Sequence, residues 1–196
     1  MNIETLDFVP AVRLHFSFLE DEFGFRVAGE GMASVRYESD AVFVEVDLGM
    51  PYFEIGLAIG LRDCSRPDRT GYGIHRLIRL CEGKSRFQYT GLQALMKTDV
   101  DVAVCEIAKL LRSYGERALR GCVDVFDAML EISISDMEQD RVDHIRLDAE
   151  AAFQKKEYRQ AAEFYSSMEP HLTATEVKKM AYARKHLAQQ QESKVK

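Results

Sequence analysis

The chain has 196 residues, of which 46% are hydrophobic, a composition that supports one or two folded domains and excludes a chain disordered throughout. Its formal net charge is −6, which argues against a nucleic-acid binder that relies on lysine and arginine contacts to phosphates. Residues 1–135 carry 21 acids and 15 bases, whereas residues 136–196 carry 11 of each, so a partner of the first part is expected to be basic.

The cysteines, the apolar runs and the first residues of the chain indicate where in the cell the protein is located. The cysteines form neither a CxxC pair nor a dense framework, which favours free thiols in a reducing compartment. No apolar run approaches the ~18 residues needed to span a bilayer, and the first residues lack a basic stretch of the secretory kind. We therefore expect a cytoplasmic protein with no membrane partner.

The first elements are a helix and four strands. Apolar residues at helical spacing from Val12 to Phe23, followed by Gly24 as a cap, predict one helix of about 14 residues. From Phe25 to Ile59 the period changes to two, which predicts four short strands in succession. Short connections favour an antiparallel meander with one face buried by helices, so the expected fold class is α+β.

The turn after the second strand sets the expected register. A two-residue turn at Ser39-Asp40 would pair Tyr37 with Val42 and Val35 with Val44, which keeps the apolar side chains on one face. We therefore expect this hairpin to be well specified.

The next turn contains a proline. Pro51 has no N–H to close a two-residue turn, so we expect a four-residue loop over residues 49–52. That loop would place Asp47 directly opposite Glu54.

The expected core consists of the apolar residues whose spacing along each strand or helix places them on one buried face. In the strands they are Val35, Tyr37, Val42, Val44, Val46, Phe53, Ile55 and Leu57. The helices that cover them are expected to contribute Phe16, Leu19, Val104, Ile107 and Leu111.

Residues 63–95 give a less regular pattern. Residues 63–70 resemble a loop, and residues 74–80 fit either an edge strand or a short helix, of which we favour the helix. Thr98 and Asp101 resemble a capping pair at the start of the next helix, and Gly121 is expected to separate that helix from a shorter one.

A helical region is expected over residues 135–196, after an α+β domain over residues 1–134. Ser135 with Glu138 forms one capping box, and Thr173 with Glu176 forms a second one that begins the last helix. The tail from residue 189 is expected to be frayed.

Small and aromatic residues in the helical region resemble one tetratricopeptide repeat: Ala149, Ala151, Phe153, Tyr158, Ala161 and Tyr165. An ordinary helical hairpin with aromatic packing explains the same residues. Because a second full copy at the 34-residue period is absent, a single hairpin must dock elsewhere. It can dock on the first domain, on the helix at residues 176–187, or on another chain.

The first domain carries a second resemblance. Phe23-Gly-Phe25 after the first helix, Val35-Arg-Tyr-Glu-Ser39, and the strand segments at 42–46 and 53–57 resemble a diffuse group of small uncharacterised bacterial proteins. Members of that group are often found near polymorphic toxin systems. The resemblance implies an immunity or partner-binding role, but its motifs are packing residues.

No catalytic, metal or cofactor motif is found. The five histidines show no i, i+4 pair, which disfavours a zinc site. Gly71-Tyr-Gly73 begins like a dinucleotide fingerprint, but Arg76 stands where the third glycine belongs. No phosphate loop or nucleophile elbow occurs. We therefore predict no cofactor, no metal and no catalytic residue.

One cluster of residues is a candidate site. With the expected register, these residues point away from the buried face: Arg36, Phe43, Glu45, Asp47 and Glu54. Facing carboxylates destabilise a sheet unless they are solvated or meet a cation. We expect a binding face for a basic protein, with Phe43 as an aromatic anchor. The alternative is an enzyme in which one of the three acids acts as a base, and the oligomeric state stays open.

Overall fold

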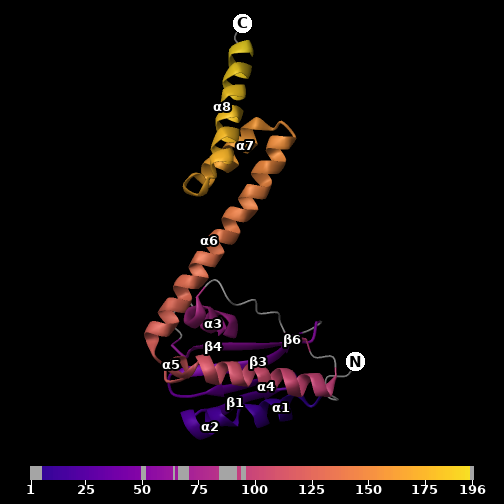
Figure 1. The fold of residues 1–196 in the computed structure, drawn as a ribbon, viewed down its shortest axis with the longest axis vertical. Coiled ribbons are helices and arrows are strands. Elements are labelled where there is room, and N and C mark those ends of the chain that lie inside the picture. Colours follow the sequence, from indigo (N-terminus) through magenta and orange to yellow (C-terminus); the bar gives the residue numbers. More distant parts are fainter. Residues whose placement is uncertain are drawn as a thin grey trace. The chain divides into compact units, whose positions relative to one another are not determined.

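We describe the fold from a computed structural model, in which the described residues are 6–49, 52–63, 65, 71–83, 92–93 and 96–194. The chain divides into two compact units, Met1–Ile132 and Ser133–Lys196, close to the expected boundary after residue 134. Helix α6 (Val123–Gln154) is continuous through this division (Figure 1).

An antiparallel sheet forms the centre of the first unit. Its strands are β1 (Arg26–Gly31), β2 (Ser34–Glu38), β3 (Val42–Gly49), β4 (Glu54–Leu61), β5 (Tyr72–Gly73) and β6 (Leu92–Gln93). The first five follow one another in space, and β6 also pairs with β4. The α+β fold and the meander of four longer strands are therefore confirmed, with two short strands added at β4.

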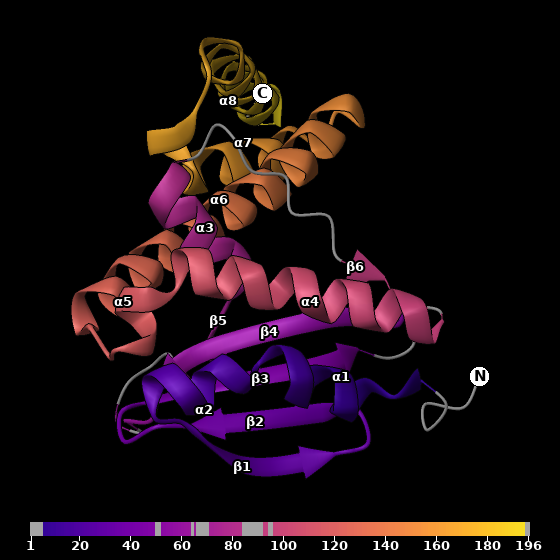
Figure 2. The ribbon, with the colours of Figure 1, turned by 60° about the horizontal axis from the view of Figure 1, so that its bottom comes forward.

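Helices cover one face of this sheet. They are α1 (Phe8–His15), α2 (Ser17–Phe23), α3 (Ile74–Glu82), α4 (Lys97–Tyr114), α5 (Glu116–Leu119) and the beginning of α6. Figure 2 shows α1, α2 and α4 together on that face. The predicted core residues are all at most 5% exposed except Phe53, which is only partly buried. The helix predicted at residues 74–80 is confirmed as α3.

The single helix predicted before Gly24 is wrong. The chain forms α1 and α2, separated at Phe16, whose ψ of 9° and φ of −101° depart from helical values. Phe16 is fully buried and its ring stacks on Tyr37 at 6.3 Å, so the break lets the aromatic side chain enter the core. Gly24, at φ 68°, ends α2 as expected.

The predicted register of the β2–β3 hairpin is wrong by two residues. Tyr37 pairs with Val44, and Val35 pairs with Val46. The Ser39 hydroxyl accepts a hydrogen bond from the Val42 N–H at 3.1 Å, so Ser39 and Val42 close the turn. The turn is therefore one residue further along the chain than expected.

The β3–β4 hairpin shows the same kind of difference. Gly49 pairs with Glu54, and Asp47 lies opposite Gly56 instead of Glu54, while residues 50 and 51 of the predicted loop lie outside the described residues. Phe53 has a φ of 52°, which is not extended, and it cannot start the strand. Because both shifts are of two residues, every side chain stays on the expected face.

Two helix starts also differ from prediction. At α4 the Asp99 carboxylate accepts the Met96 N–H at 3.0 Å, so the helix begins before Thr98. No helix begins at Ser135, because α6 continues through it, and Glu138 instead binds Arg141 at 2.7 Å. The shorter helix predicted after Gly121 is therefore the long helix α6.

The second unit contains the end of α6, α7 (Tyr158–Ser167), a turn of 3-10 helix (Glu169–His171) and α8 (Ala174–Lys194). Ala149 and Ala161 are fully buried in its core. Helix α7 packs against α8, so the hairpin docks on the last helix. The capping box is confirmed, because the Glu176 carboxylate accepts the Thr173 N–H at 2.7 Å. Residues 189–194 of the tail predicted to fray are assigned to the helix, and residues 195 and 196 lie outside the described residues.

Among the described residues, no helix is both long enough and apolar enough to cross a bilayer.

Candidate binding face on the sheet

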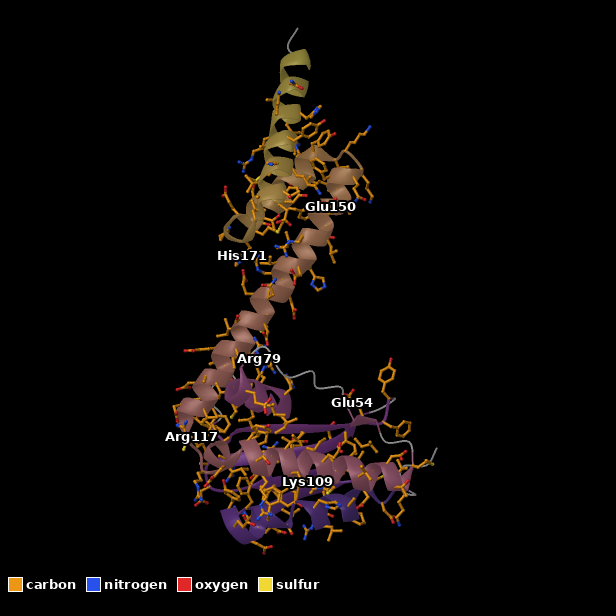
Figure 3. The ribbon with its side chains drawn as sticks, viewed as in Figure 1. Glu54, Arg79, Lys109, Arg117, Glu150 and His171 are labelled. Atoms are coloured by element: carbon orange, nitrogen blue, oxygen red, sulfur yellow. The ribbon has the colours of Figure 1, made fainter. Side chains whose placement is uncertain are left out.

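Strand alternation places one set of side chains on the face of the sheet opposite the helices, which we call the outer face. Arg36 lies opposite Glu45, Glu45 lies opposite Ala58, and Asp47 lies opposite Gly56. The structure therefore brings Arg36, Glu45 and Asp47 together on adjacent strands. Glu54 lies at the start of β4, beside the β3–β4 turn (Figure 3).

Arg36 is engaged within the sheet. Its guanidinium donates to Glu38 at 2.9 Å and to Glu45 at 3.0 Å. It also lies 4.0 Å above the ring of Phe43, and Arg62 binds Glu38 from the other side at 3.2 Å. Arg36 thus cross-links β2 and β3 and compensates part of the acidic charge.

Phe43 does not serve as an exposed anchor, so that part of the prediction is wrong. The residue is 2% exposed. Its ring lies on Gly60, where a Cβ would come within 2.6 Å of the Phe43 Cε1 atom. Because glycine has no side chain, the ring lies against the β4 backbone, and the Arg36 guanidinium covers it. Because its ring contacts both the β4 backbone and the Arg36 guanidinium, Phe43 is a packing residue.

Asp47 is a half-buried acid that has no ion pair within the described part of the chain. Its carboxylate lies over Gly56, where a Cβ would be 2.7 Å from Oδ1. Burial raises the pKa of Asp47 above its ordinary value of 3.8, and the negative charges of Glu45 and Glu54 add to this effect. Within the described part of the chain, no group donates a hydrogen bond to this carboxylate. We call Glu45, Asp47 and Glu54 the acidic patch.

The turn beside the acidic patch contributes an aromatic ring that sequence reasoning missed. Tyr52 is 70% exposed and directly precedes Phe53 and Glu54. Phe53 packs against the core and adopts a positive φ, a conformation that non-glycine residues rarely take and that often marks functional sites. The only sequence signal was an aromatic pair in a loop after Pro51.

Three cavities of about 530 to 550 Å³ lie elsewhere in the first unit. One lies between α1 and α4, one is lined by α3, α4, α5 and α6, and one is lined by the ends of α2 and α5 and the β2–β3 turn. None of these three is lined by the acidic patch. Over the described ranges, no group of histidine, cysteine or acidic side chains could hold a metal ion.

Comparison of the chain with protein-family models, with curated proteins and with solved structures finds no match. Function must therefore be inferred from the side chains themselves.

Proposed function

We propose that the chain is a non-enzymatic binding protein whose acidic patch takes a basic segment of a protein partner. The observation that carries this proposal is Asp47. Its carboxylate is half-buried beside two other acids, its pKa is raised, and no described group donates to it. A lysine or arginine of the partner would supply the missing positive charge.

The neighbouring residues have distinct roles in this proposal. Glu45 is paired with Arg36, which keeps its carboxylate on the outer face and compensates part of its charge. Glu54 is exposed at the edge of the patch and steers the partner during association. Tyr52 has the role of aromatic anchor that the sequence analysis gave to Phe43. An exposed ring beside carboxylates can make both cation–π and apolar contacts with a partner.

The resemblance to small bacterial proteins near toxin systems extends the proposal to an immunity-type role. The partner would then be a toxin-like protein with a basic surface. The raised pKa of Asp47 also fits a general base, but the patch lies on a sheet face and lines none of the three cavities described above. We therefore favour binding over catalysis.

The test is binding of a fluorescent decalysine peptide to the full chain, measured by anisotropy at low and physiological salt. We expect the Asp47→Asn/Glu54→Gln variant to weaken binding about tenfold or more, since two of the three patch charges are lost. Tyr52→Ala should mainly speed dissociation.

The matched control removes two exposed charges from the helices, in the variant Asp21→Asn/Glu106→Gln. It should leave the affinity within about twofold of the parent, because screening limits charges far from the contact. Equal weakening by both double variants would mean that the peptide senses only net charge, and the proposal would fail.

A further inference from the structure

The helical unit carries a second surface built from aromatic rings. Phe153 at the end of α6, Tyr158 at the start of α7, and Tyr182 and His186 in α8 form one aromatic cluster. The ring centroids are 5.8 Å apart for Phe153–Tyr158, 4.8 Å for Tyr158–His186 and 4.5 Å for Tyr182–His186. Tyr182 is 47% exposed, so the cluster reaches the surface.

Unpaired cations lie near these rings in the sequence. Within the described part of the chain, five exposed basic side chains of this unit have no ion pair or hydrogen bond: Lys155, Lys156, Arg159, Lys178 and Lys185. By contrast, Arg141, Arg146 and Lys179 each bind a carboxylate.

The unpaired cations are close to the cluster along the chain. Lys155, Lys156 and Arg159 flank Tyr158, while Lys178 and Lys185 lie within one helical turn of Tyr182. Glu157 is the one acid within the turn between α6 and α7. We call the aromatic cluster and these five cations the basic aromatic surface.

We infer that the basic aromatic surface is a second binding site, which takes an acidic segment of a protein. Carboxylates complement the unpaired cations, and apolar side chains of the same segment can lie on Tyr182. This goes beyond the proposed function, because the acidic patch is proposed to take a partner of opposite charge.

The ring geometry favours an acidic protein segment over nucleic acid. Bases stack on open aromatic faces, whereas His186 already stacks on Tyr158 with an interplanar angle of 19°. The chain's net charge of −6 would also repel a long polyanion, while a short acidic segment meets mainly the local positive charge.

The test uses a fluorescent decaglutamate peptide and the full chain, with anisotropy as the readout. We expect saturable binding that weakens with salt and is reduced about tenfold or more by Lys155→Glu/Lys185→Glu. Tyr182→Ala should also weaken binding. The matched control, Arg26→Glu/Lys109→Glu, makes the same change in net charge in the first unit and should bind like the parent (Lys109, Figure 3). Circular dichroism confirms that each variant is folded.

Three kinds of outcome would overturn the inference. The first is a failure of the peptide test itself, in which the parent does not bind decaglutamate or the control variant loses binding equally. The second is that a ten-nucleotide oligothymidine binds more tightly than decaglutamate, which would assign the surface to nucleic acid. The third is concentration-dependent self-association of the parent in sedimentation velocity that Lys155→Glu/Lys185→Glu removes, which would assign the surface to a second copy.

Discussion

At the scale of single residues, two glycines of β4 determine how the β3 side chains lie. Gly60 accepts the Phe43 ring and Gly56 accepts the Asp47 carboxylate, each at a distance that no Cβ would allow. The first contact is favourable, because an aromatic ring covers backbone that would otherwise be exposed. The second holds a charged group against the sheet and partly out of water, which disfavours ionisation.

This arrangement predicts that Asp47→Asn stabilises the protein at neutral pH. Because the folded-state pKa of Asp47 is raised, the folded chain binds the proton more tightly than the unfolded chain. The unfolding free energy therefore falls as the pH rises from about 3.8 through the raised pKa. The Asp47→Asn variant should not lose unfolding free energy in this way. Its unfolding free energy should therefore exceed that of the parent most at pH 7, and the difference should vanish near pH 3. Urea unfolding across this pH range measures it.

Asp40→Asn is the matched control, because Asp40 is exposed in the β2–β3 turn. It should leave the pH dependence of the parent unchanged. If Asp47→Asn is instead less stable than the parent at pH 7, the carboxylate is compensated in the folded protein, and the reason for assigning it a cationic partner disappears.

At the scale of elements, the sequence showed which side chains of each strand face the core. It did not show which residues of neighbouring strands pair with one another. The period of two identified the buried face of β2, β3 and β4, since a side chain's face depends only on parity. Register depends on which residues close a turn. At the first turn this was decided by the Ser39 hydroxyl, which replaces a backbone acceptor. At the second it was decided by the positive φ of Phe53. Neither the Ser39 hydrogen bond nor the positive φ of Phe53 can be predicted from the hydrophobic pattern.

The candidate site was predictable to the same extent. The alternation of side chains along each strand correctly placed Arg36, Glu45 and Asp47 on one face. Parity could not show that Phe43 is buried there as well, because that depends on Gly60 lying opposite it in the true register. The exposed Tyr52 lies in a turn, where periodicity carries no information.

A capping pair in the sequence predicted a helix start only where no packed helix continues through it. Thr173 and Glu176 form their box as expected. Ser135 and Glu138 have the same spacing, but buried residues on both sides, Met129 before them and Val142 and Ala149 after them, keep the chain helical through this pair. Packing on both sides of a capping motif therefore outweighs the motif.

The hairpin of the second unit predicts a strict size limit at Ala161. The residue is fully buried in α7 within a core that also contains Ala149. Ala161→Leu should reduce the unfolding free energy by about 1 to 3 kcal/mol, because a well-packed core has no room for the added methylenes. Ala151→Leu, at an exposed position of α6, should be nearly neutral. Thermal unfolding monitored by circular dichroism compares the two, and a neutral Ala161→Leu would contradict close helix packing.

At the scale of the whole molecule, the two units have separate cores. The core of the helical unit draws its buried residues from 142–180, and the core of the first unit draws them from 6–129. Among the elements that the structure describes, only α6 contributes to both. Each unit is therefore expected to keep its packing when the other loses it.

Val44→Asp tests this independence. Val44 is fully buried in the centre of the sheet, so a charge there costs several kcal/mol and should unfold the first unit. Hydrogen exchange read by mass spectrometry should show loss of protection in β2, β3 and β4, while α7 and α8 stay protected. Equal loss in both units would show that they fold as one cooperative body.

The continuity of α6 through the boundary has a consequence for local stability. From Glu131 to Arg141 no side chain of this helix is buried, so no core packing holds these turns, although Glu138 pairs with Arg141 and with His171. Helices ordinarily fray from their ends inward, but the ends of α6 lie in two hydrophobic cores. In α6 we therefore expect the order to be reversed: the middle opens first, and its peptide bonds become accessible to a protease before those at the two ends of the helix.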